Sequence, residues 1–105
     1  MSGPGPMRIR AVAARDGTVE VRVLMSHEME SGQRVEAGAV VPAWFIGQVT
    51  ATHNGRVVMR AQWGPSVSKN PYFAFKFRGG KAGDKVALDW IDNRNETRSD
   101  ETTIA

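Results

Sequence analysis

Apolar residues recur at every second position over most of this chain, and no window repeats them at the helical spacing. Successive side chains of a β-strand point to opposite faces, so a period of two predicts strands with one buried face. The expected strands cover residues 9–13, 19–23, 45–51, 57–63, 73–77, 86–90 and, more weakly and at a sheet edge, 96–104. Seven short strands with turn residues between them favour an all-β, antiparallel β-sandwich.

A chain of 105 residues is expected to form one domain with an adequate core. We expect residues 1–7, which are rich in Gly and Pro, to form a flexible lead, and residues 8–105 to form the sandwich. The connection over residues 27–43 has no clear period and is expected to cross between the sheets. The absence of cysteine excludes disulfides, thiolate metal sites and cysteine nucleophiles.

Two dipeptides, Asp-Gly and Asn-Gly, mark hairpin turns near residues 17 and 55. A two-residue turn in the second hairpin would mix charged and apolar residues on both faces. A three-residue loop over 53–55 instead places Val49 opposite Met59, with apolar residues on one face. The same loop over 15–17 aligns the first hairpin. We therefore predict bulged loops in both hairpins, with positive φ at Gly17 and Gly55.

Net charge is +3, and the fourteen Lys and Arg residues are scattered among eleven Asp and Glu residues. This pattern indicates a mixed, solvated surface rather than the basic stripe of a nucleic-acid-binding protein. No apolar run reaches the length of about 20 residues that spans a membrane. The first residues lack the apolar region of a secretory signal, so the residues alone favour the cytoplasm.

One candidate metal site has the spacing Met25-x-His27-x-Met29, which places three side chains on one face of a strand. Thioether and imidazole ligands together suit Cu(I). A small Cu(I)-binding protein is therefore the alternative function. The competing interpretation is that these residues cover the sandwich edge, where adaptable Met also suits a protein contact.

Neither a hydrolase motif nor a phosphate-binding loop is evident. The chain has no Gly-x-Ser-x-Gly sequence, and the glycine-rich stretch 79–84 lacks the Walker spacing. That stretch is better explained as a turn between two strands. We therefore expect no catalytic residue, and the leading interpretation includes no cofactor and no metal site.

The loop over residues 63–71 is the stronger candidate for a binding surface. Trp63 ends a core-facing strand, and Pro65 and Pro71 stiffen the loop that follows. A stiff loop loses little conformational entropy when it docks. Tyr72 points away from the Phe stripe of the next strand. We therefore expect Trp63, Tyr72, Met29 and the residues between them to form one patch with an apolar centre and a polar rim, as is typical of protein interfaces.

Two long stretches, VRVLMSHEMESGQR and QWGPSVSKNPYFAFKFRGGKAGDKV, strongly resemble the SoxZ family of sulfur-oxidation proteins. MRIRA near the start and WIDNRNETRSDETTIA at the end agree as well, so the resemblance covers residues 7–105. It implies an immunoglobulin-like sandwich that pairs with SoxY, whose C-terminal Gly-Gly-Cys arm holds the sulfur substrate of thiosulfate oxidation. The resulting carrier complex visits the other Sox enzymes in turn.

The resemblance also implies a location and a set of contacts. SoxZ is exported to the periplasm with SoxY and without a signal peptide of its own, which revises the cytoplasmic expectation. In isolation the partner-facing surface is expected to permit a homodimer. We expect neither nucleic acid nor a membrane as partner. Motif agreement and exposure together select these partner-binding residues: Met25, His27, Met29, Trp63, Pro65, Val67, Lys69, Asn70 and Tyr72.

Overall fold

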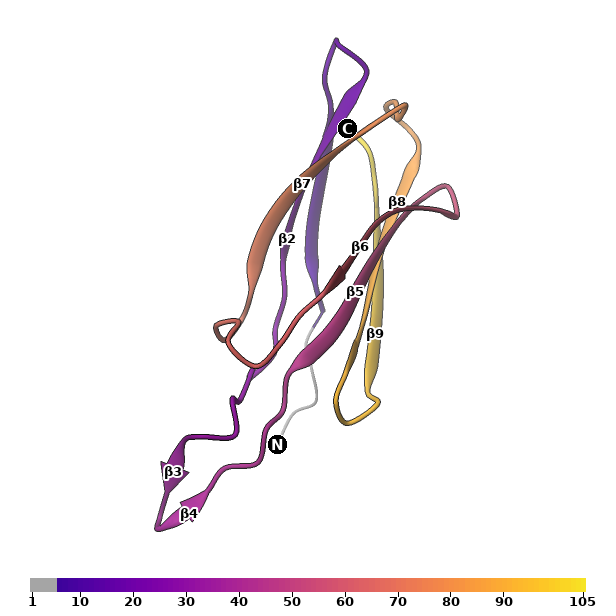
Figure 1. Cartoon of the computed structure of the whole chain (residues 1–105). Coiled ribbons are helices and arrows are strands. Elements are labelled where there is room, and N and C mark those ends of the chain that lie inside the picture. The colour runs from indigo at the N-terminus through magenta and orange to yellow at the C-terminus, as the bar shows by residue number, and fades with distance from the viewer. Residues whose placement is uncertain (1–5) are drawn as a thin grey trace.

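Two antiparallel sheets face each other in the computed structural model, which describes residues 6–105 (Figure 1). The three-stranded sheet has the order β1-β2-β7, formed by β1 (Arg8–Ala13), β2 (Thr18–Leu24) and β7 (Tyr72–Arg78). The four-stranded sheet has the order β6-β5-β8-β9, formed by β6 (Arg56–Gln62), β5 (Ile46–His53), β8 (Lys85–Asp92) and β9 (Thr97–Thr103). The predicted all-β sandwich is confirmed, and β9 lies at an edge as expected.

The core fills the space between the sheets because each strand turns alternate residues inward. In β2 the valines Val19, Val21 and Val23 are fully buried, and in β8 the core residues are Val86, Leu88 and Trp90. Most of the expected N-terminal lead, residues 1–5, lies outside the described residues. Met7 is buried, and its backbone N–H donates to the Asp100 carboxylate at 3.0 Å. Met7, which was expected to belong to the flexible lead, is therefore part of the packed domain.

The β1–β2 hairpin has the predicted register. Ala11 lies opposite Val21, and the Ala14 N–H donates to the Thr18 carbonyl across the three-residue loop at 2.8 Å. Gly17 ends that loop with φ of 87°, as predicted. A one-residue slip would turn the buried valines of β2 toward solvent, so burial selects this register.

The β5–β6 hairpin has a different turn from the one predicted. Positive φ at Gly55 is confirmed, but His53 pairs directly with Arg56, so the loop contains only Asn54 and Gly55. Both loop residues have positive φ, 48° and 85°, as a two-residue hairpin turn requires. The pairing then shifts by one residue within β6, between the partners of Ala51 and Thr52. Beyond this bulge the apolar residues of β5 and β6 again share one face of the sheet. The predicted three-residue loop was expected to produce the same arrangement.

The connection from β2 to β5 crosses between the sheets, as expected, but part of it is regular. A short hairpin of β3 (Val35–Glu36) and β4 (Ala39–Val40) projects from one end of the body (Figure 1). Two-residue strands are too short to show a sequence period, so the sequence pattern does not predict them.

The two sides of the sandwich, where the edges of the sheets face each other, differ in their backbone hydrogen bonds. At one side Ala105 joins the chain to β1, because its N–H donates to Ala11 and its carbonyl accepts from Ala13, both at 2.9 Å. At the other side lie the edge strands β6 and β7, and no backbone hydrogen bond joins them within residues 6–105. The interior is therefore covered by side chains alone on the β6–β7 side.

Candidate functional site

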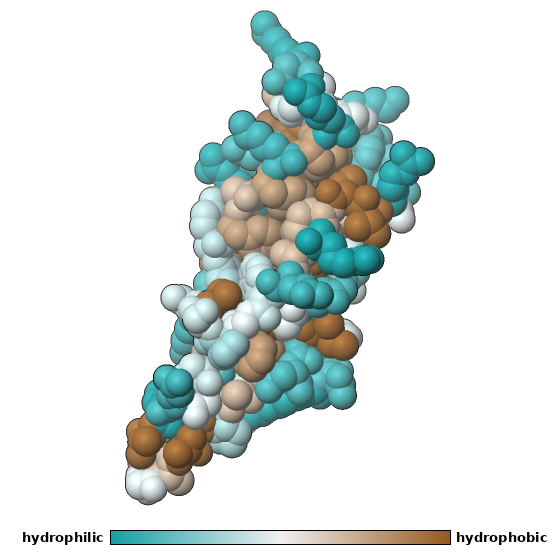
Figure 2. All heavy atoms as spheres, viewed as in Figure 1, coloured by the Kyte–Doolittle hydropathy of each residue, from teal (hydrophilic) through white to brown (hydrophobic). Residues whose placement is uncertain are grey.

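The open side between β6 and β7 is lined by large apolar side chains that are only partly buried. They pack against the core from β6, β7 and the loop between these strands, and we call them the apolar mouth: Met59, Trp63, Val67, Phe73 and Phe75. Figure 2 shows apolar side chains gathered between β7 and β6 on this face. The chain by itself therefore leaves part of its aromatic interior in contact with water.

Aromatic geometry holds the apolar mouth in place. The Trp63 and Phe73 rings meet edge to face, with centroids 5.4 Å apart and planes at 86°. Phe73 and Phe75 are stacked along β7, with centroids 6.1 Å apart and planes at 17°. Both arrangements are favourable for aromatic pairs, so the mouth is a preformed surface. The alternation of Phe73 and Phe75 predicts a fully buried face; they are only partly buried because the sheet order places β7 at an edge.

The predicted contact loop is divided between two surfaces. Trp63 and Val67 belong to the apolar mouth, and Pro65, Lys69 and Asn70 are exposed around it. Tyr72 is 60% exposed but faces outward from β7, where it lies opposite Leu24. The expectation of one continuous patch from Trp63 to Tyr72 is therefore wrong. Trp63 packs against Phe73, and Tyr72, the neighbour of Phe73 in β7, points to the opposite face of the sheet.

The contact loop is fastened to the segment 25–29, so the two predicted regions do meet. The Asn70 N–H donates to the His27 carbonyl at 2.9 Å, and the His27 N–H donates back to Asn70 Oδ1 at 3.1 Å. The Met25 N–H donates to the Pro71 carbonyl at 2.9 Å, and Lys69 Nζ lies 3.0 Å from Glu28 Oε2. The backbone of segment 25–29 thus supports the contact loop.

Alternate side chains of that supporting segment face the interior. Met25, His27 and Met29 share one face, as predicted, but they are only 1%, 5% and 6% exposed. They are therefore not surface residues of this chain, and the exposure expected for them is wrong. The cause is the crossing of the chain from β2 toward the second sheet, which covers the strand end that was expected to be open.

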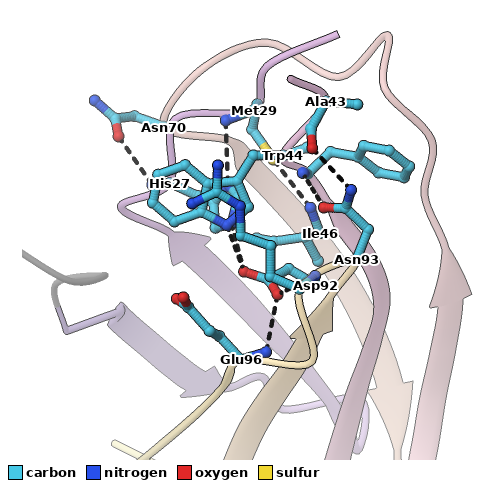
Figure 3. A network of polar contacts seen from close by, with 11 residues as sticks. His27, Met29, Ala43, Trp44, Ile46, Asn70, Asp92, Asn93 and Glu96 are labelled. Carbon is cyan, nitrogen blue, oxygen red and sulfur yellow. Dashed lines mark hydrogen bonds and ion pairs between the residues drawn. The ribbon is translucent and has the colours of Figure 1, made fainter. Parts of the chain in front are cut away.

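A buried polar network centres on His27 (Figure 3). Its Nε2 lies 3.1 Å from Asp92 Oδ2, and its Nδ1 accepts the Met29 N–H at 3.1 Å. Since Nδ1 accepts, the ring donates from Nε2. Trp44 Nε1 donates to the same Asp92 oxygen at 2.8 Å. The network therefore joins the end of β8 to the connection between the sheets.

Asp92 is the most heavily hydrogen-bonded carboxylate of the network. Its Oδ1 accepts the backbone N–H groups of Arg94 and Glu96, both at 2.9 Å. Burial acts to raise the pKa of Asp92, but hydrogen bonds from His27, Trp44 and these backbone groups outweigh it and hold the pKa below its usual value. The carboxylate is consequently charged in the folded protein and anchors the network.

The same contacts argue against the alternative copper site. Both ring nitrogens of His27 are engaged, and the Met29 sulfur lies 3.4 Å from the Ile46 N–H. A Cu(I) ion would have to break the bond to Asp92 or the bond to Met29 before it gained a nitrogen ligand. The network is structural.

Comparisons with known proteins agree with the sandwich fold and indicate the family. A superoxide reductase (neelaredoxin) from Archaeoglobus fulgidus has a similar structure at 20% identity and TM-score 0.64, covering 100% of this chain and 93% of that one. A hypothetical protein from Pyrococcus horikoshii OT3 is similar at 18% identity and TM-score 0.66, covering 100% and 95%. These likenesses show the fold alone. No curated protein sequence matches. The family model described as "Sulphur oxidation protein SoxZ" matches residues 7–103.

Proposed function

The chain belongs to the SoxZ family of sulphur oxidation proteins, and on this premise we propose that it is the non-catalytic subunit of the SoxYZ sulfur carrier. In this role it binds SoxY, whose C-terminal cysteine arm holds the sulfur substrate, and helps to present that arm to the other Sox enzymes. We further propose that it acts in the periplasm after export together with SoxY.

The observation that carries the proposal is the apolar mouth. Edge strands with a hydrophobic opening between them are a liability for a soluble subunit unless another chain covers them. The interiors of stable interfaces are rich in aromatic residues and Met, which are the residue types of the mouth. The exposed contact residues Lys69 and Asn70 supply a polar rim, and Pro65 is exposed beside them. SoxY is the occupant that we assign to this surface.

The absence of cysteine supports the division of labour. The chain has no thiol and cannot itself hold a persulfide or thiosulfonate. A thiol close to the carrier cysteine would exchange with the sulfur bound there. A cysteine-free companion therefore protects the intermediate while it supports the subunit that carries it.

Co-expression with SoxY tests the proposal, with native mass spectrometry of the purified material as the measurement. We expect a one-to-one complex, and we expect Trp63→Arg and Met59→Arg to weaken it by about thirtyfold, since a buried interface anchor contributes about 2 kcal/mol or more. Ser99→Arg is the matched control, because Ser99 is exposed on the outer face of β9. Circular dichroism verifies that each variant folds.

Two results would contradict this assignment. Retention of SoxY by both mouth variants would move the interface elsewhere. A homodimer of the isolated chain that SoxY does not dissociate would assign the mouth to a second copy of this chain.

A further inference from the structure

Basic side chains are concentrated on the outer face of the β1-β2-β7 sheet. On these strands the buried residues, such as Ala11, Val21 and Phe77, face inward, so their neighbours face outward. The outward basic residues are Arg8, Arg10, Arg22, Lys76 and Arg78, and the outward acidic residue is Glu20. Five positive charges and one negative charge leave this face with a net charge of +4.

The outer face of the other sheet is neutral by comparison. Its strands present Arg60 and Lys85 outward, and Asp89 and Glu101 balance them. The whole chain has a net charge of +3, so the excess charge is concentrated on a single face. Basic residues that are scattered along the sequence therefore gather on one face of the folded protein.

One strand pair on the basic face brings like charges together, which lowers the stability of the sheet. Arg10 lies directly opposite Arg22, and like charges in that position destabilise a sheet. The Glu20 carboxylate lies 3.1 Å from the Arg22 guanidinium, but this ion pair is exposed and contributes little to the stability of the fold. Within residues 6–105 no ion pair neutralises Arg8 or Arg10, and residues 1–5 contain no acidic residue.

One end of the basic face has an apolar hollow. Leu24 and Tyr72 are 41% and 60% exposed there. The hollow has a volume of about 210 Å³ and is lined by Arg8, Ile9, Arg10, Arg22, Leu24 and Tyr72. Its size suits one apolar side chain, and the guanidinium groups at its rim suit carboxylates beside that side chain.

We propose that this face docks an acidic protein surface that inserts one apolar side chain between Leu24 and Tyr72. The basic groups extend over three strands and about seven residues, or roughly 10 by 20 Å at ordinary strand spacings, which is too wide for one small anion. Tyr72 is the single aromatic side chain on the face, so it offers no series of stacking platforms for nucleic-acid bases. The inference stands apart from the proposed function, because this face points away from the apolar mouth.

Arg10→Glu provides the decisive variant. It replaces the repulsive Arg10–Arg22 pair by an oppositely charged pair, so we expect thermal stability to be unchanged or higher. The probe is a fluorescent peptide of Glu and Asp with a central Phe, and the measurement is anisotropy with the purified chain at physiological salt. We expect affinity to fall about fivefold or more, since a reversed surface charge changes binding by about 1 kcal/mol. Tyr72→Ser is expected to weaken the Phe peptide but not a Phe-to-Ser peptide.

Arg60→Glu is the matched control, because it makes the same charge change on the neutral face. Several outcomes would overturn the proposal: no binding of the peptide up to millimolar concentration, equal binding of a Gln and Asn version, or equal loss with Arg60→Glu. Displacement by sulfate at constant ionic strength would assign the face to small anions. Tighter binding of a DNA duplex of equal charge, also lost in Arg10→Glu, would assign it to nucleic acid.

Discussion

The His27 imidazole lies 3.1 Å from the Asp92 carboxylate, and neither side chain is exposed. Asp92 ends β8, and His27 follows β2, so this contact joins the two sheets at the end where the contact loop lies. The backbone of His27 in turn holds Asn70 of that loop. A buried hydrogen-bonded network thereby fixes the position of an exposed surface. Variants of Asp92 and Asn70, and the dependence of stability on pH, test this connection.

Asp92→Asn should lower the free energy of unfolding by about 3 kcal/mol. The amide would present N–H groups to the donors of His27 and Trp44 and leave buried donors without acceptors. Urea denaturation monitored by tryptophan fluorescence measures the change. Asp89→Asn, at an exposed position of the same strand, is the control and should change stability by less than about 0.5 kcal/mol. Similar stabilities for the two variants would contradict a structural role for Asp92.

Stability should fall at acid pH. The pKa of Asp92 is lowered by the hydrogen bonds that outweigh its burial, and that of Asp100 is lowered chiefly by Arg98. Because each folded pKa lies below the unfolded value of about 3.9, the stabilisation is complete above that pH and is lost as pH falls through the folded pKa values. Unfolding free energies measured across this range should therefore decline below about pH 4. Asp92→Asn should decline less steeply, and an equal slope would refute the assignment.

Asn70 should hold the contact loop through its side chain as well as its backbone. Asn70→Ala removes the acceptor of the His27 N–H and places alanine at φ of 51°, a strained conformation. We expect hydrogen exchange of the His27 amide to become about fivefold faster, since one hydrogen bond contributes about 1 kcal/mol. Asn70→Asp keeps the acceptor and should preserve protection. Asn70→Gly removes the same acceptor without introducing strain, so the His27 amide should exchange as fast as in Asn70→Ala. Slow exchange in both variants would show that the side chain is not needed.

Gly17 and Gly64 provide a matched test of backbone conformation. A Cβ at either position would meet no atom within 4 Å, but only Gly17 has φ in the left-handed region, at 87°. Gly17→Ala should therefore destabilise the protein by about 1 kcal/mol, whereas Gly64→Ala should leave stability unchanged or slightly higher. Thermal unfolding of the two variants measures the difference. Equal midpoints would show that the first hairpin does not depend on this turn.

The two hairpins show how far local sequence determines pairing. In the first, burial of Val19, Val21 and Val23 and a single turn glycine select one register, which the pattern predicts correctly. In the second, a two-residue turn plus a bulge and a three-residue loop give the same alternation of faces. The alternation of apolar residues reports which face is buried, not how many residues form the turn, so it could not separate these solutions.

The sequence by itself determined the seven strands of the sandwich and the family, because alternation of apolar residues is a local property and the SoxZ stretches are long. Tertiary structure decided which of these residues reach the surface. Met25, His27 and Met29 became interior when the chain crossed over them, and Phe73 stayed partly exposed because β7 is an edge. The basic residues of β1, β2 and β7 are distant in sequence and meet only when the strands pair. Burial and charge density depend on long-range neighbours, which a local pattern does not contain.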